Sequence, residues 1–143
     1  MGKLYVYENC IVCGDRNPIG FNIEFKHGDG FVYGIVNPGI NFEGYGDVIH
    51  GGISSTFLDE VMVKALFSID VIAITMEINI RFRKPVKTGM EITIKGYPGE
   101  VKSRVALARG EILLPDKSVA VEADGKFYIL KDKEKTKVLG YVK

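Results

Sequence analysis

The residues that could do chemistry gather around position 50, where a histidine and two glycines precede a run that carries two acids. The stretch from Val48 to Glu60 reads VIHGGISSTFLDE. Apolar residues recur every four positions from Ile53 to Leu66, which predicts a helix from about Gly51 to Ile69 that is apolar on nearly every side and therefore buried. Because an unpaired buried carboxylate is costly, we expect Asp59 to face a cavity or a partner subunit.

The two glycines suit the binding of a carbonyl oxygen. Gly51 and Gly52 carry no side chains, so an acyl carbonyl can approach the backbone N–H groups at the start of the helix. Those groups have no partner within the helix and lie at the positive end of its dipole. A tight turn into the helix is the alternative explanation of the glycines. His50 has no Ser or Cys nucleophile beside it in the motif, so it is not interpreted as a triad base, and a polar cap is its simplest role.

The two acids have different predicted roles. Asp59 lies about two turns into the helix, and Ser55, four residues earlier, shares its face and is placed to hydrogen-bond it or a water molecule. An ordinary interface or ion-pair carboxylate is the alternative for Asp59. Glu60 lies about 100° around the helix from Asp59, and we expect it to be structural and paired with Lys64 at i+4.

Cys10 and Cys13 form a single C-x-x-C, which fits a redox pair, half a zinc site or two ordinary thiols in a turn. A closed zinc site needs four ligands, and His27 and His50 do not stand at zinc-finger spacing. A redox pair should open a helix, whereas a turn-rich stretch follows Cys13. Structural thiols are therefore preferred, and no metal is predicted.

The charge balance excludes some function classes. With 19 basic and 18 acidic residues the formal net charge is +1, so no global field attracts nucleic acid or an anionic membrane. The start of the chain lacks the apolar segment of a signal peptide and no stretch is apolar over a membrane span, so a cytoplasmic location is expected. Arg81, Arg83, Lys84 and Lys87 form a local basic cluster, which suits phosphate binding and equally a solvated strand edge.

With 143 residues, the chain is predicted to form one domain over residues 1–143. Alternating apolar residues predict strands, and glycine-rich or charged stretches predict loops. The expected order is a hairpin of Phe21–Lys26 and Phe31–Val36, a loop over Asn37–Asp47, the helix, a long strand over Val71–Phe82, strands over Glu91–Tyr97, Val101–Leu114 and Val119–Leu130, a solvated tail over Lys131–Lys137 and a docking segment over Val138–Val142. A single helix cannot cover both faces of such a sheet, so the predicted fold is α+β, an antiparallel sheet curled around one long helix.

Four segments of the chain resemble one family. His50-Gly51-Gly52 is followed nine residues after the histidine by Asp59, and the stretch from Ile78 to Gly89 reads INIRFRKPVKTG. Cys10 to Gly20 and the loop from Glu43 to Gly46 match further segments. These residues resemble the hotdog-fold acyl-CoA thioesterases of the PaaI-like (phenylacetic acid degradation-type) branch of the thioesterase superfamily.

The resemblance implies hydrolysis of acyl-CoA thioesters in a homodimer or a dimer of dimers, with coenzyme A as part of the substrate and no other cofactor. It assigns the backbone of Gly51 and Gly52 to the carbonyl, His50 to positioning the loop and substrate, and Asp59 to general base or nucleophile across the subunit interface. Substrate-binding candidates are Glu43, Ser55, Arg83, Lys84 and Lys87. Many members carry Asn or Gln six or seven residues before the histidine, where this chain has Gly44 and Glu43.

Two alternatives remain open on the same scaffold. A non-catalytic acyl-CoA binding or sensing protein stays open because the Asn or Gln is missing. A hydratase of this fold would need an Asp followed five residues later by His, and neither histidine has that partner.

Overall fold

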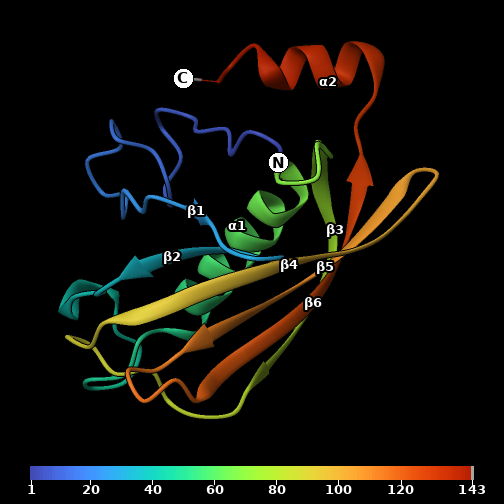
Figure 1. Cartoon of the computed structure of the whole chain (residues 1–143). Helices are drawn as coiled ribbons and strands as arrows, with labels where there is room; N and C mark the ends of the chain where they lie inside the picture. The colour runs from blue at the N-terminus through green and yellow to red at the C-terminus, as the bar shows by residue number, and fades with distance from the viewer. Residues whose placement is uncertain (143) are drawn as a thin grey trace.

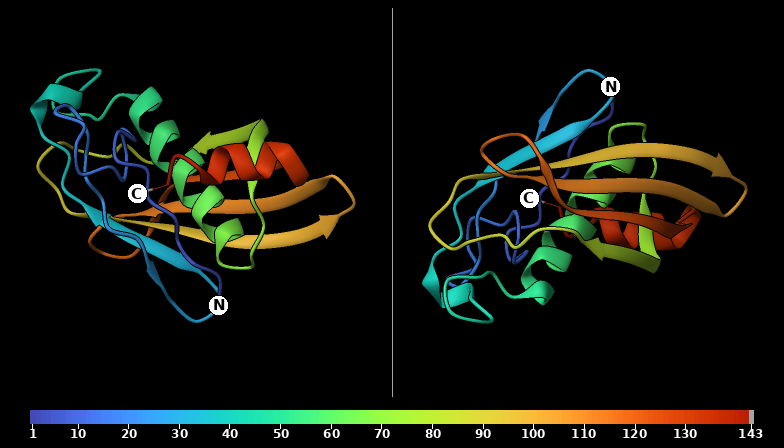
Figure 2. Two further views of the ribbon diagram at one scale, coloured as in Figure 1. Left: turned by 90° about the horizontal axis from the view of Figure 1, so that it is seen from above. Right: turned by 90° about the horizontal axis from the view of Figure 1, so that it is seen from below.

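The computed structural model describes residues 1–142 and contains one antiparallel sheet with two helices. The elements are β1 (Lys26–His27), β2 (Val32–Val36), a 3-10 turn (Ile40–Phe42), α1 (Gly51–Phe67), β3 (Ala73–Phe82), β4 (Ile92–Lys102), β5 (Val105–Leu113), β6 (Val119–Ile129) and α2 (Asp132–Leu139). The six strands lie in the order β1-β2-β4-β5-β6-β3. The predicted α+β fold is confirmed, because the sheet curves around α1 (Figure 1, Figure 2).

The core lies between α1 and the concave face of the sheet. The central helix residues Phe57, Leu58, Val61 and Met62 have no exposed surface, and they pack against small and branched residues of β4, β5 and β6. At Gly96 of β4 the helix backbone comes so close that a side-chain carbon would collide with the carbonyl oxygen of Val61. The absence of a side chain there therefore sets how deeply α1 sits in the sheet.

The predicted hairpin is only half correct. Phe21 to Glu24 form no strand, and pairing with β2 is confined to Lys26 and His27. The backbone N–H groups of Phe21 and Ile23 instead donate to the carbonyls of Ile11 and Val12, at 2.8 Å in both cases. Apolar residues do alternate in this segment, but its backbone N–H groups bind the N-terminal segment and not a neighbouring strand.

The predicted break between the strands Glu91–Tyr97 and Val101–Leu114, which falls at Pro98 and Gly99, is also wrong. β4 continues through both residues, and its register with β5 shifts between Pro98 and Val101, which marks an irregularity rather than a turn. The chain reverses at Ser103, whose φ of 44° lies in the left-handed region. Val101 and Lys102 therefore belong to β4, and β5 starts at Val105.

The long predicted strand is β3, and it forms one edge of the sheet. Ile78 and Ile80 pack against the core as the alternation predicts. Its register with β6 shifts between Thr75 and Glu77, and Met76 and Phe82 are each 57% exposed. The face that the alternation predicts to be apolar, formed by Met76, Ile78, Ile80 and Phe82, is thus only partly buried within one chain.

The predicted solvated tail over Lys131–Lys137 is exposed along its whole length, as expected, and most of it forms a helix. α2 has exposed charged residues along most of its length, and Val138 and Leu139 pack against a small cluster of Phe67, Ile72 and Leu130. The docking prediction for this end of the chain is confirmed for these two residues. Among the described helices, none combines the length and apolar character needed to span a membrane.

Candidate active site

The start of α1 presents one unused backbone donor. His50 is the N-cap, and its Nδ1 accepts a hydrogen bond from the Gly52 N–H at 2.8 Å. The carbonyl of His50 accepts from the N–H groups of Ile53 and Ser54, at 2.9 Å and 3.2 Å. Within the described part of the chain, the Gly51 N–H donates to no group. Because His50 caps the helix through the Gly52 N–H, the Gly51 N–H is the donor that a ligand can use.

A cavity of about 550 Å³ opens beside this donor. Its wall is formed by the loop before α1, the first turn of α1 and the end of β3 with the residues that follow it. The lining residues include His50, Gly51, Ser54, Phe82, Arg83 and Lys84. A methyl group on Gly51 would touch the Phe82 ring at 3.5 Å, so the glycine keeps the space beside the ring open. No carboxylate of the described residues lines this cavity.

The basic residues divide into two groups. Arg83 and Lys84 line the cavity, whereas Lys87 is exposed outside it and Arg81 pairs with Asp124 at 3.4 Å. Arg83 donates to Glu122 at 2.5 Å from Nη2 and 3.0 Å from Nε. This pairing raises the pKa of Arg83 and lowers the pKa of Glu122. Glu122 therefore holds a guanidinium at the rim of the cavity.

Glu43 orders the loop that leads to α1. Its Oε2 accepts a hydrogen bond from the Asp47 N–H at 3.0 Å, and its backbone forms a bridge with Ile49. Glu43 also lines a second cavity of about 390 Å³ with His50 and Gly52, and Gly51 is not among its lining residues. The acid that replaces the expected amide is thus close to the glycine motif, but one of its oxygens is occupied.

Asp59 lies away from the cavity. It is half-buried on α1, about 12 Å along the helix axis from Gly51, and its Oδ1 accepts a hydrogen bond from the Thr75 hydroxyl at 2.5 Å. Ser55, its predicted partner, instead donates to the Gly51 carbonyl at 2.8 Å. Thr75 on β3 was missed from the sequence, because nothing local relates a residue in the next strand to an acid in the helix.

The predicted pair of Glu60 and Lys64 is confirmed. Lys64 Nζ lies 3.4 Å from Glu60 Oε2, and the lysine side chain is 1% exposed. The pair does not stand alone, because Cys10 contacts Glu60 and Cys13 contacts both Glu60 and Lys64. The ligating atoms of Cys10, Cys13 and Glu60 lie within 4.8 Å of one another, so these three are the residues that could hold a metal ion among those described.

Comparison with known proteins assigns a family. Residues 46–121 match the Thioesterase superfamily. A crystal structure of a thioesterase superfamily protein aligns with a TM-score of 0.81 and 26% identity, over 85% of this chain and 60% of that one. This chain therefore spans less than two thirds of that relative. No curated protein sequence matches.

Two further solved structures share the fold at lower identity. A hypothetical thioesterase of Streptococcus pneumoniae, crystallised with coenzyme A, has a TM-score of 0.72 and 20% identity over 78% of this chain and 88% of that one. Mutants of it with Asp→Ala and with Thr→Ala have also been solved. The E. coli PaaI protein of the phenylacetic acid degradation operon has a TM-score of 0.70 and 18% identity, over 76% of this chain and 83% of that one.

Proposed function

Because the chain belongs to the thioesterase superfamily, we propose that it hydrolyses acyl-CoA thioesters to a carboxylic acid and free coenzyme A. We place it in the PaaI-like branch of that family. The observation that carries the proposal is the unused N–H of Gly51 at the start of α1, a residue that lines a cavity together with Arg83 and Lys84.

The Gly51 N–H supplies carbonyl polarisation. A thioester oxygen bound there receives a hydrogen bond and lies at the positive end of the helix dipole, where the negative charge of a tetrahedral intermediate is stabilised. His50 supports this geometry by capping the helix through Gly52. The cations at the rim suit the phosphates of coenzyme A, with Arg83 held in place by Glu122 and Lys87 further out.

The absence of a carboxylate from the cavity wall is the argument for a dimer. The cavity of one chain has no carboxylate among the described residues, and Asp59 on the same helix is about 12 Å away from Gly51. β3 is an edge strand with unpaired backbone groups, and it exposes Ile74 and Met76 by 50% and 57%. An edge of this kind is a surface for pairing with a second copy. We infer a homodimer, alone or as a dimer of dimers, in which Asp59 of one subunit meets Gly51 of its partner.

In this arrangement Asp59 is the general base or the nucleophile. As a base it removes a proton from water while the water oxygen attacks the thioester carbon, and the coenzyme A thiolate then leaves and is protonated. The Thr75 hydroxyl holds the carboxylate in one orientation. The S. pneumoniae protein supports the pairing, since its substituted Asp and Thr are sixteen residues apart, the separation of Asp59 and Thr75.

Asp59→Asn tests the proposal. With a panel of aromatic and aliphatic acyl-CoAs, and thiol release as the readout, we expect kcat to fall by about a hundredfold or more, because general-base catalysis contributes that much. Asp124→Asn is the matched control, since Asp124 is an exposed acid paired with Arg81 on the sheet. Light scattering should give the same dimer mass for both variants. Wild-type turnover by Asp59→Asn would refute the assignment.

A second function is favoured by Glu43. Because this acid stands where many relatives carry Asn or Gln and is hydrogen-bonded to the Asp47 N–H, a protein that binds acyl-CoA without hydrolysing it is the alternative. Calorimetry with the same acyl-CoA panel separates the two, because tight binding with no thiol release supports the binding protein.

A further inference from the structure

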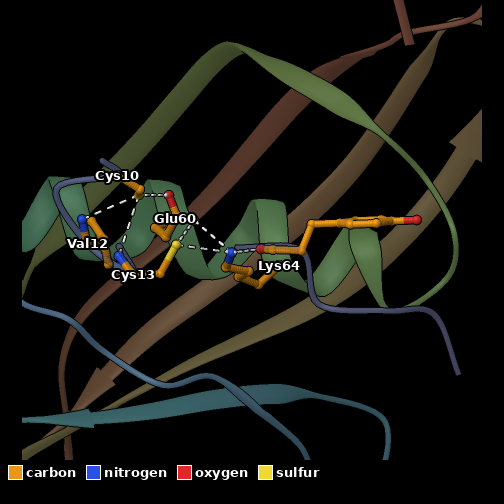
Figure 3. A network of polar contacts seen from close by, with 6 residues as sticks. Cys10, Val12, Cys13, Glu60 and Lys64 are labelled. Atoms are coloured by element: carbon orange, nitrogen blue, oxygen red, sulfur yellow. Dashed lines mark hydrogen bonds and ion pairs between the residues drawn. The ribbon is translucent and has the colours of Figure 1, made fainter. Parts of the chain in front are cut away.

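A largely buried cluster of two thiols, a carboxylate and an ammonium lies against α1, and the proposed chemistry uses none of its groups (Figure 3). The N-terminal segment folds Cys10 and Cys13 onto the helix at Glu60 and Lys64. Cys10 Sγ lies 3.5 Å from Glu60 Oε1, and Cys13 Sγ lies 3.8 Å from Glu60 Oε2 and 3.3 Å from Lys64 Nζ. Cys13 is 4% exposed, and both cysteines are free thiols.

Two neighbours, the Cys10 thiol first and the Lys64 ammonium second, favour ionisation of Cys13 over that of Cys10. Lys64 also donates to the Tyr5 carbonyl, and its charge needs a negative partner because burial of an unpaired charge is costly. The hydrogen bond from the Cys10 thiol, together with Lys64, lowers the pKa of Cys13 to about 6. The pKa of Cys10 is raised by the same hydrogen bond and by burial. Burial raises the pKa of Glu60 to about 7, against the effect of Lys64. Cys13, which lies 3.3 Å from the Lys64 ammonium, is thus the sulfur whose thiolate form is favoured, and Cys10 stays beside it as a thiol.

The same geometry disfavours a metal ion. The Lys64 ammonium occupies the position of a cation, near both the Cys13 sulfur and the Glu60 carboxylate. Among the described residues only three side chains offer ligands here, whereas a structural zinc site uses four. A metal would have to displace a buried charged side chain that is already hydrogen-bonded to the backbone.

We propose that Cys10 and Cys13 are a reactive dithiol that hydroperoxides convert to an intramolecular disulfide. Access is provided by a cavity of about 260 Å³, whose wall includes Cys13 and Lys64. This space is several times the volume of about 30 Å³ that a water molecule occupies in the liquid, so hydrogen peroxide fits in it. It is separate from the cavity beside Gly51, and the two share no lining residue.

The chemistry has two steps. The Cys13 thiolate attacks one peroxide oxygen and the O–O bond breaks, which gives a sulfenic acid and a hydroxide that is protonated to water. Cys10 then loses its proton to Glu60 Oε1 and its sulfur attacks the Cys13 sulfur. The S–O bond breaks, and the leaving hydroxide takes this proton from Glu60 to become the second water. The two sulfurs are oxidised by two electrons in total, and the peroxide is reduced to two water molecules. The sulfurs lie within 4.8 Å of each other and must close to about 2 Å, which requires movement of the turn between them.

Hydrogen peroxide added to the reduced protein tests this proposal by intact mass and a free-thiol count. We expect a mass loss of two hydrogen atoms and the loss of both thiols, reversed by dithiothreitol. Cys10→Ser should stop at a sulfenic acid that dimedone traps on Cys13. The Asp59→Asn variant should be oxidised at the wild-type rate, so the readout does not depend on thioesterase activity. Two thiols that stay reduced in the folded protein, under conditions that oxidise the denatured chain, would overturn the proposal.

Lys64→Met tests whether the Lys64 charge favours the thiolate form of Cys13. Iodoacetamide alkylation of Cys13 at about pH 6 should slow by about fivefold, the effect of raising the thiol pKa by about one unit. Lys126→Met is the control, because Lys126 is exposed and pairs with Glu77 on the sheet. If circular dichroism shows that Lys64→Met does not fold, the Cys10→Ser result alone decides the proposal. Stoichiometric zinc in the purified protein that is lost in Cys13→Ser would overturn it in favour of a metal site.

Discussion

Removal of the Thr75 hydroxyl is the most direct test of how Asp59 is held. Thr75→Val keeps the branched shape on β3 but removes the donor that lies 2.5 Å from Asp59 Oδ1. A hydrogen bond to a charged group contributes about 1.5–3 kcal/mol when buried. Thr75 is exposed and Asp59 half-buried, so we expect about 1.4 kcal/mol at the transition state, which corresponds to about a tenfold lower kcat.

The assay is thiol release at saturating acyl-CoA, with Thr75→Ser as the rescue variant because it keeps a hydroxyl at the same position. Thr75→Val should lower kcat with little change in KM, since the hydroxyl orients the acid and does not contact the substrate. Thr75→Ser should recover most of the activity. If Thr75→Val turns over at the wild-type rate while Asp59→Asn is inactive, the hydrogen bond has no catalytic role and the reasoning fails.

Two further predictions concern stability. Gly96→Ala should lower the free energy of unfolding by about 1–3 kcal/mol in urea titrations, because the new methyl group collides with the Val61 carbonyl, and Gly39→Ala, with open space around its α-carbon, is the control. Glu60 keeps a proton in the folded state up to a pKa of about 7, whereas the unfolded state releases it near 4.5, so its contribution to stability falls as pH rises between these values. Over this window the wild type should lose about 2–3 kcal/mol relative to Glu60→Gln, and equal pH profiles of the two proteins would contradict the raised pKa.

Features that depend on local spacing were predictable from the sequence. The helix was placed within two residues of its observed end, because apolar residues recur along it at helical intervals. The pair of Glu60 and Lys64 follows from their i+4 separation on that helix. The thioesterase family was correctly indicated by the glycine motif and the acid nine residues after His50, and residues 46–121 bear this out.

Features that depend on contacts with residues far along the chain were not predictable from the sequence. Phe21–Glu24 has the alternation of a strand, but only the fold determines that its amides meet Ile11 and Val12 rather than a neighbouring strand. β4 passes through Pro98 because its irregular register with β5 accommodates the proline, which the sequence of one strand cannot reveal. The C-terminal charged run forms α2, where Val138 and Leu139 find an apolar cluster made by distant residues.

The same division applies to the sites. The sequence by itself determined the buried helix, its glycine start and the acids along it, because each of these rests on neighbours within about two turns of one another. Only the tertiary structure decided that the Thr75 hydroxyl contacts Asp59 and that His50 binds the Gly52 N–H, so that the Gly51 N–H stays unused. It also decided that the two cysteines, whose motif was ambiguous, lie against a buried lysine. The reactivity of a side chain depends on which groups are buried next to it. In this chain those neighbours come from segments as far apart in sequence as Cys13 and Lys64.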